Sequence, residues 1–182
     1  MNNNLENSYK KKLNHISTFI FDIDGVLTDG KVHITTTGDL MRSMHTKDGF
    51  AIKTALKKGY RVAIISGARD QNVIARLTYL GIKDIFINVD NKLPVYEQYI
   101  KDHQLNPQEV LYMGDDIPDI PLLRQVGLSA APHDAVQEVL DTVDYISLKN
   151  GGETCVRDVI EQVLRVQGRW TFNIIENDTA AN

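Results

Sequence analysis

An α/β fold built on a doubly wound parallel sheet is predicted by two features of the sequence. Short apolar runs, several of them nearly continuous in Val, Ile and Phe, alternate with segments whose apolar residues recur at helical spacing. Continuous apolar runs are typical of strands that helices cover on both faces. The alternation itself predicts βαβ units, in which the strands are parallel. Ligands of such sheets bind beyond the carboxyl ends of the strands.

The expected elements follow this pattern in order along the chain. Strands are expected at 16–22, 60–66, 85–89, 110–114 and 144–148, the last being an edge strand or an extended loop. Helices are expected at 48–58, 70–80, 94–104, 117–126, 135–140 and 153–166. Gly59 and Gly81 follow the first two helices, where glycine commonly ends a helix. The runs 31–34 and 40–46 flank a Thr-rich turn with Gly38, which predicts a β-hairpin flap.

Length and composition limit the functional classes. A chain of 182 residues predicts a single domain over 1–182, with flexible tails at 1–14 and 177–182, the first of which could instead be a short helix start. The formal net charge of −4 argues against binding to nucleic acid or to an anionic membrane. The single cysteine, Cys155, excludes an intrachain disulfide and a Cys-rich zinc site. No apolar run approaches the roughly 20 residues of a membrane span. We therefore expect a soluble, cytoplasmic protein.

Carboxylates follow two of the expected strands. Asp22 and Asp24 come after the first strand, and Asp115 and Asp116 after the strand at 110–114. Because parallel strands end at the same edge of a sheet, these side chains should converge. Each Asp could instead cap the helix that follows it. Four carboxylates at two strand ends favour a shared cation, and an oxygen-only cluster suits Mg²⁺.

Two further positions could bind an anion at the same edge. Ser66-Gly67 ends the strand at 60–66, where a hydroxyl and free backbone N–H groups can bind phosphate, although Ser is also a common helix cap. Lys92 lies between a strand and the helix that contains Pro94, where its ammonium could reach the site. A loop lysine is otherwise usually solvated surface.

Together these motifs resemble the haloacid dehalogenase superfamily. They occur in that family's order: Asp22-Ile23-Asp24 followed by Gly25, then Ser66-Gly67, then Lys92, then Gly114-Asp115-Asp116-Ile117-Pro118-Asp119. The resemblance covers about residues 18–157. It implies a Rossmann-like core and phosphoryl transfer through an aspartyl phosphate.

The resemblance also implies a role for each matching residue. Asp22 would attack phosphorus, because a carboxylate is ionised at neutral pH and needs no partner base. Asp24 would protonate the leaving oxygen and then activate water. Mg²⁺ would be held by Asp22, the Asp24 carbonyl and Asp115. The remaining site residues would stabilise charge or orient the metal waters and the lysine: Ser66, Lys92, Asp116 and Asp119. Asp119 could alternatively lie on a helix surface.

The spacing leaves no room for a cap domain. The flap and one helix fill the segment between Gly25 and Ser66, and one helix and one strand fill the segment between Gly67 and Lys92. An isolated chain would then leave its site open to water, so a neighbouring subunit is the economical way to enclose a small substrate. We expect the flap to supply that contact, with Ile34, Met41 and Met44 available for burial.

The capless pattern looks like one family in particular, the 3-deoxy-D-manno-octulosonate 8-phosphate phosphatases with the related sialic-acid-type sugar phosphatases. The matching residues are the run 45–49 (His-Thr-Lys-Asp-Gly) and the late Gly151-Gly152 with Arg157. The resemblance implies a homotetramer. It also implies substrate contacts beside Asp24 and Lys92, from His45, Thr46, Lys47, Asp48, Gly49, Lys53, Gly67, Arg69 and Arg76. Lys53 and Arg76 could alternatively lie on solvated helix faces.

Two positions depart from that family's pattern. Ala68, followed by Arg69, stands where the family often has arginine directly after Ser-Gly. Lys47 stands where arginine is frequent, and lysine cannot form a two-pronged contact with a carboxylate. Both changes bear on which sugar acid is recognised.

The resemblance therefore implies a Mg²⁺-dependent phosphomonoesterase that acts on 3-deoxy-D-manno-octulosonate 8-phosphate in lipopolysaccharide precursor synthesis. The nearest alternative is a phosphatase of a nine-carbon sialic-acid-type sugar 9-phosphate. A non-catalytic phospho-receiver is less favoured, because in a receiver the acidic pair comes first and the phosphorylated Asp lies in a later strand. An inactive scaffold on the same fold has no support, since every core residue is present.

Overall fold

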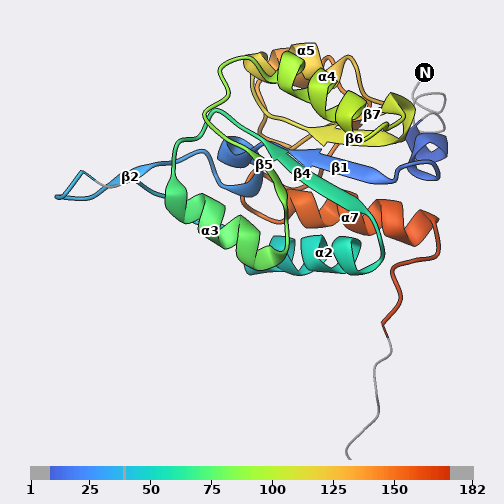
Figure 1. Ribbon diagram of the computed structural model, residues 1–182, viewed down its shortest axis with the longest axis horizontal. Coiled ribbons are helices and arrows are strands. Elements are labelled where there is room, and N and C mark those ends of the chain that lie inside the picture. The colour runs from blue at the N-terminus through green and yellow to red at the C-terminus, as the bar shows by residue number, and fades with distance from the viewer. Residues whose placement is uncertain (1–8, 39, 173–182) are drawn as a thin grey trace, which may run out of the picture.

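A six-stranded parallel sheet forms the centre of the protein, whose computed structural model describes residues 9–38 and 40–172 (Figure 1). Its strand order is β5-β4-β1-β6-β7-β8, with every neighbouring pair parallel. The strands are β1 (Thr18–Phe21), β4 (Arg61–Ile65), β5 (Asp84–Phe86), β6 (Val110–Met113), β7 (Leu128–Ala131) and β8 (Tyr145–Ile146). The predicted doubly wound sheet is confirmed.

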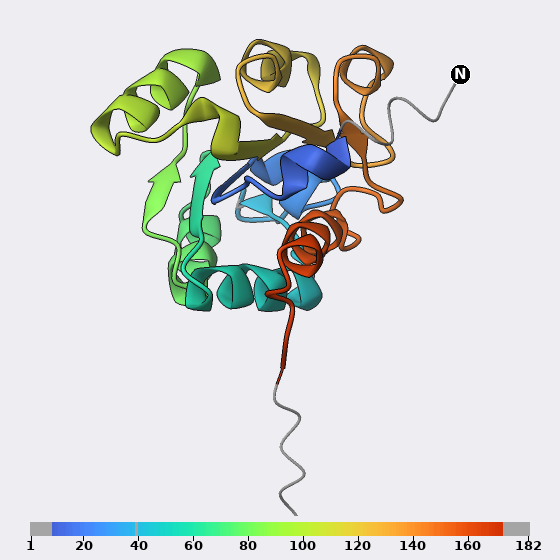
Figure 2. The ribbon, with the colours of Figure 1, turned by 90° about the vertical axis from the view of Figure 1, so that its right-hand side faces the viewer.

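Helices cover both faces of this sheet (Figures 1 and 2). One face carries α2 (Thr46–Lys57), α3 (Gln71–Leu80) and α7 (Cys155–Val166). The other carries α4 (Lys92–Asp102), α5 (Ile120–Leu123) and α6 (Gln137–Leu140), and the short η2 (Pro107–Glu109) precedes β6. Across the described ranges, no helix combines the length and apolar character that crossing a bilayer requires.

Alternate side chains of each strand enter opposite cores. In β1, Phe19 and Phe21 pack in the core under α2 and α7, whereas Ile20 packs in the core under α4 and α5. This follows from the two-residue period of a strand. All three are fully buried, and burying such a side chain stabilises the fold by roughly 1.5–3 kcal/mol. Both faces of β1 therefore need apolar side chains, which explains why its apolar run is nearly continuous.

Two segments differ from the predicted elements. β7 was not predicted, because Ser129, Ala130 and Ala131 have low strand propensity and only burial between β6 and β8 selects that conformation. The single helix predicted at 117–126 is wrong. It is divided into η3 (Ile117–Asp119) and α5, since Pro118 and Pro121 lack the N–H that a continuous helix needs. The segment 144–148 contributes an edge strand of two residues, β8.

The hairpin flap extends away from the sheet (Figure 1). It consists of β2 (His33–Ile34) and β3 (Leu40–Met41), which are antiparallel. Ile34 and Met41 are 76% and 55% exposed, whereas Met44 packs against the core instead of being free for a partner. Between β1 and β4, the described residues form only η1 (Ile23–Leu27), the flap and α2, so they contain no cap domain.

The first described residues belong to the folded body. Residues 9–13 are helical, Leu13 is buried, and Lys12 Nζ lies 2.7 Å from Asp144 Oδ1. Of the two alternatives for this segment, residues 9–13 form the helix start, and the expectation that nothing here enters the core is wrong because Leu13 is buried. The rest of the predicted tails, 1–8 and 177–182, lies outside the described residues.

Asp48 joins α2 to α7. Its side chain is buried, and Oδ1 accepts a hydrogen bond of 2.7 Å from the backbone N–H of Arg157 in the first turn of α7. Oδ2 has no hydrogen-bond partner among the described residues. Burial raises the pKa of Asp48 to about 6. The predicted contact between Asp48 and substrate is wrong, because the carboxyl is enclosed between two helices.

The raised pKa makes Asp48 a source of pH-dependent stability. Its pKa in the folded chain lies above the ordinary value of an aspartate, so the carboxyl destabilises the fold as pH rises through about 6 and it ionises. We expect Asp48→Asn to be more stable than the wild type at pH 8 by about 1–3 kcal/mol, with the difference vanishing near pH 4. Urea unfolding at both pH values measures this.

The exposed Asp102→Asn provides the matched control and should show no such pH-dependent difference. An Asp48→Asn protein that is less stable than the wild type at pH 8 would mean that the ionised carboxylate stabilises the contact between α2 and α7.

Candidate active site

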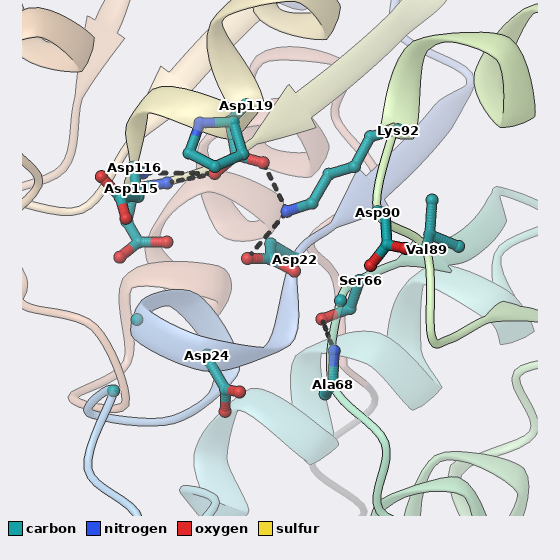
Figure 3. Close-up of a pocket in the computed structure, with 14 residues that line it drawn as sticks. Asp22, Asp24, Ser66, Ala68, Val89, Asp90, Lys92, Asp115, Asp116 and Asp119 are labelled. Atoms are coloured by element: carbon teal, nitrogen blue, oxygen red, sulfur yellow. Dashed lines mark hydrogen bonds and ion pairs between the residues drawn. The ribbon is translucent and has the colours of Figure 1, made fainter.

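Three neighbouring strands deliver polar residues to one edge of the sheet. In the register of β1 with its two neighbours, Phe21 pairs with Ile64 of β4 and Met113 of β6. The residues that follow these strands therefore emerge together, as predicted for parallel strands. They line a pocket of about 440 Å³ whose walls are Asp22, Asp24, Gly25, Gly30, Ser66, Gly67, Ala68, Val89, Asp90, Lys92, Asp115, Asp116, Pro118 and Asp119 (Figure 3).

Asp22 is held rigidly at the base of this pocket. Its backbone N–H donates to the carbonyl of Met113, and its Oδ2 lies 3.0 Å from Lys92 Nζ. Its Oδ1 has no hydrogen-bond partner among the described residues, although the side chain is buried. Burial raises the pKa of Asp22 and the Lys92 ammonium opposes that rise. An unpaired buried carboxylate oxygen is costly, so Oδ1 is suited to a cation or to an electrophile.

Lys92 and Asp119 form a buried ion pair beside Asp22. Lys92 begins α4, and its Nζ lies 2.6 Å from Asp119 Oδ1. The Tyr112 hydroxyl donates to the same Asp119 oxygen, and the N–H groups of Asp115 and Asp116 donate to the other. Burial alone would lower the pKa of Lys92, but Asp22 and Asp119 outweigh it and raise the pKa. Lys92 therefore remains a cation, and Asp119 orients it.

The acidic residues can hold a metal ion. Carboxylate oxygens of Asp22, Asp115 and Asp119 lie within 4.8 Å of one another. Burial, followed by the charges of Asp22 and Asp119, raises the pKa of Asp115 to about 8. A hard divalent cation would relieve both the repulsion and the unpaired Asp22 oxygen, so the site fits such an ion. The Asp24 carboxylate is not in this cluster. Asp116 lies at the pocket rim, where its Oδ1 accepts from the Ile117 N–H.

Glycines allow the loops of the site to approach closely. Gly25 has φ of +78°, and a Cβ there would lie 1.9 Å from Asp115 Oδ2. A Cβ at Gly151 would lie 1.9 Å from the carbonyl oxygen of Gly25, and the Gly152 N–H donates to Val26 O. The late Gly-Gly pair thus clamps the loop after β1. Arg157 lies over the ring of Trp170 at 5.5 Å, away from the pocket.

The loop after β4 turns its polar groups inward. Ser66 is buried, its Oγ accepts from the Ala68 N–H at 3.2 Å, and its carbonyl accepts from the Val89 N–H. Ala68 is buried in the pocket wall next to Gly67. The side chain of Arg69 is 71% exposed and lies 3.6 Å from Asp90, and it does not line the pocket. Arg69 therefore does not substitute here for an arginine at position 68.

Asp24 is engaged by an arginine that the sequence did not single out. Arg42 follows β3, and its Nε and Nη2 donate to Asp24 Oδ1 and Oδ2 at 2.7 and 3.0 Å. Its Nη1 donates to Asp70 Oδ2 at 3.4 Å, and its side chain is only 6% exposed. The hydrogen bonds with Asp24 raise the pKa of Arg42. The only feature of the sequence that could have indicated this contact is a single basic residue, Arg42, in the segment of the flap that returns to the sheet.

Most residues predicted to contact the sugar do not line this pocket in the single chain, and their contact with substrate stays a prediction. His45, Thr46, Lys47, Gly49, Lys53 and Arg76 do not line it. The reason is local packing. His45 Nδ1 caps α2 by accepting from the Lys47 N–H, and Lys53 Nζ lies over the Tyr79 ring at 4.2 Å. Gly49 is buried against α3. Thr46 and Arg76 line a second cavity of about 510 Å³ beside Arg42.

Comparison with protein families places the chain among enzymes. Residues 45–127 match the model of the haloacid dehalogenase-like hydrolases. The chain is similar to the 3-deoxy-D-manno-octulosonate 8-phosphate phosphatase of Escherichia coli K12, with 34% identity over 158 residues, which cover 87% of this chain and 84% of that protein.

The chain is also similar to solved structures of 3-deoxy-D-manno-octulosonate 8-phosphate phosphatases. The crystal structure of 3-deoxy-D-manno-octulosonate 8-phosphate phosphatase from Yersinia pestis superposes with a TM-score of 0.86 at 32% identity, over 88% of this chain and 86% of that chain. The enzyme from Moraxella catarrhalis, in complex with a magnesium ion, a phosphate ion and the sugar acid KDO, has a TM-score of 0.86 at 29% identity, over 92% and 94% of the two chains.

The pKa of Asp115 makes metal binding depend on pH. Below about pH 8 a metal must displace the proton of Asp115, so Mg²⁺ should bind about tenfold more weakly for each pH unit below that value. At a fixed Mg²⁺ concentration near the Kd, we expect the increase in Tm caused by Mg²⁺ to be larger at pH 8.5 than at pH 6. Differential scanning fluorimetry during MgCl₂ titration measures it. Asp115→Asn should abolish the increase and Asp102→Asn should retain it, whereas equal increases at both pH values would contradict the role of Asp115.

Proposed function

The chain belongs to the 3-deoxy-D-manno-octulosonate 8-phosphate phosphatase family of haloacid dehalogenase-like hydrolases, and on that premise we propose that it hydrolyses 3-deoxy-D-manno-octulosonate 8-phosphate to the free sugar acid and phosphate. It is a phosphoric monoester hydrolase. The observation that carries the proposal is Asp22, with one oxygen on Lys92 and the other unpaired beside the Asp115 carboxylate. We place the reaction in the cytoplasm, in lipopolysaccharide precursor synthesis.

Asp22 is the nucleophile of the proposed mechanism. Its unpaired Oδ1 forms the bond to phosphorus, the bond from phosphorus to the sugar oxygen breaks, and an aspartyl phosphate results. Lys92 holds the other oxygen of Asp22 and so fixes the direction of attack. Asp119, buried against Lys92, keeps that ammonium in place. Water then hydrolyses the acyl phosphate and regenerates the carboxylate.

Mg²⁺ is the cation that fits the oxygen-only site. The carboxylates of Asp22 and Asp115 and the backbone carbonyl of Asp24 would hold it. When bound, the ion supplies positive charge between an anionic nucleophile and an anionic phosphate. The chain itself contributes further positive potential through Lys92 and through the backbone N–H groups at Ser66-Gly67-Ala68.

Asp24 handles the protons. In the first step it donates a proton to the departing sugar oxygen, and in the second it accepts one from the attacking water. It lines the same pocket as Asp22 and lies two residues further along the chain, beyond the end of β1. Its carboxylate must face the substrate to perform either task.

A nine-carbon sugar acid 9-phosphate is the second candidate substrate. The observation that favours it is the pocket wall at Ala68, where the expected arginine is missing and Arg69 points outward. Without a fixed cation at that position, the pocket restricts the position of the substrate carboxylate less.

Phosphate release separates these candidates. We expect strong Mg²⁺-dependent release from 3-deoxy-D-manno-octulosonate 8-phosphate, weaker release from nine-carbon sugar acid 9-phosphates and from hexose phosphates, and none in EDTA. Preference for a nine-carbon acid would assign the chain to the sialic-acid type. Absence of release from every ester would refute the phosphatase proposal.

Asp22→Asn is the matched variant for this assay. It keeps the shape of the side chain and removes the nucleophile, so turnover should fall by roughly a thousandfold or more. Because burial raises the pKa of Asp22, the neutral amide should not destabilise the fold, and circular dichroism should show an unchanged Tm or a higher one. A folded variant that retained most of its activity would refute the aspartyl-phosphate mechanism.

We also propose that the enzyme is a homotetramer in which the flaps meet centrally and a neighbour closes each site. The support is the flap itself, a ribbon of two short strands that stands away from the sheet with Ile34, Leu40 and Met41 exposed (Figure 1). Exposed apolar side chains grouped on one protruding element are typical of protein contacts. A neighbour would also account for the predicted sugar contacts that the chain's own pocket lacks.

Light scattering tests this assembly. The wild type should have the mass of four chains of 20.5 kDa, and Ile34→Glu should dissociate it because burying a new carboxylate in an apolar contact is costly. Leu148→Glu alters a comparably exposed apolar residue outside the flap and should leave the mass unchanged. A monomeric wild type would refute the tetramer.

A further inference from the structure

Arg42 has no part in the mechanism above, yet it binds one of its central residues. The guanidinium forms a two-pronged contact with both oxygens of Asp24, at 2.7 and 3.0 Å. The Thr28 hydroxyl also donates to Asp24 Oδ1, at 3.3 Å. Figure 3 shows the Asp24 carboxylate pointing away from Asp22 and Lys92. Both oxygens of the acid–base residue are therefore occupied on the side of the flap.

This contact is incompatible with the chemistry assigned to Asp24. Both oxygens of the Asp24 carboxyl accept from the guanidinium, so neither is placed to form a hydrogen bond with a leaving oxygen. The carboxyl also faces the wrong way. The arrangement therefore describes an idle enzyme, and Asp24 must leave Arg42 before the sugar oxygen can be protonated.

The surroundings of Arg42 show what could separate the pair. Arg42 lines the 510 Å³ cavity between the flap and α3, together with Arg76 and Asp70. Apolar side chains of Met41, Met44 and Val73 line the same cavity. Two arginines in a largely apolar cavity next to the phosphate pocket can accept an anion. Arg42 already binds Asp70 through Nη1, so a substrate carboxylate would displace Asp24 only by accepting from Nε and Nη2, the two groups that now hold Asp24.

We propose that Arg42 is a positioning residue that latches Asp24 away from the reacting phosphate and releases it when the carboxylate of a sugar-acid substrate enters the flap-side cavity and takes the guanidinium. The inference rests on the proposed phosphatase function and adds a selection step to it. A phosphate ester without a carboxylate leaves the latch closed and is hydrolysed slowly, although its phosphate fits the pocket.

Arg42→Met tests the latch on three esters. Methionine has a similar length to arginine and carries no charge. For the sugar-acid phosphate, kcat/KM should fall by about tenfold or more, because the carboxylate loses its partner. For glucose 6-phosphate, kcat/KM should rise by about threefold or more, because Asp24 is free to act as an acid. For p-nitrophenyl phosphate, whose leaving group needs no proton, it should stay within about twofold.

Arg42→Lys is a second variant that tests the latch even if Arg42→Met fails to fold. A single ammonium cannot make both bonds to Asp24, so changes in the same directions but smaller are expected. Arg165→Met removes an exposed arginine that pairs with Glu161 on α7 and should leave all three esters unaffected.

A fall by the same factor for all three esters in both Arg42 variants would mean that Arg42 only supports the structure, and would overturn the latch while leaving the phosphatase intact. No change for any ester would also overturn it. A wild-type protein that hydrolyses none of the esters would instead refute the proposed function on which the latch rests.

Discussion

Repulsion among buried carboxylates is the constraint on which the site depends. Asp22, Asp115 and Asp119 bring their oxygens within 4.8 Å of one another, and a single ammonium, that of Lys92, lies in contact with two of them. One cation cannot balance three carboxylates, and burial, followed by the charges of Asp22 and Asp119, raises the pKa of Asp115 to about 8. A divalent cation bound among the three carboxylates would complete the charge balance.

The fold holds these like charges together by backbone packing. Gly25 meets the Asp115 carboxylate, and Gly114 meets Asp119, at distances where any side chain would collide. Gly151 closes over the Gly25 carbonyl from a segment more than a hundred residues away along the chain. Because each of these approaches uses backbone atoms, the acidic residues have few alternative positions. Rigid loops of this kind resist the electrostatic force that would otherwise spread the carboxylates apart.

The parts of this site that could be predicted from the sequence are those set by local pattern. Asp22, Ser66 and Asp115 each follow a strong apolar run, and parallel topology alone brings strand ends together. Strand β7 escaped prediction because Ser129 and its alanine neighbours become a strand only through burial. Arg42 and Asp48 escaped for a related reason. The contact of Arg42 with Asp24 depends on where the returning limb of the flap lies, and the burial of Asp48 depends on how α2 packs on α7.

The central place of β1 has a consequence for synthesis of the chain. This strand pairs with β4 on one edge and with β6 on the other, and β6 begins only at Val110. While the ribosome is still adding the intervening residues, the strand Phe19-Ile20-Phe21 has one open edge and two incompletely covered apolar faces, because α5 and α7 follow β6 in the chain. Contacts this distant in sequence form slowly. The nascent chain therefore exposes an apolar strand edge until β6 emerges, and the pairing of β6 both protects that edge and brings Asp115 to Asp22.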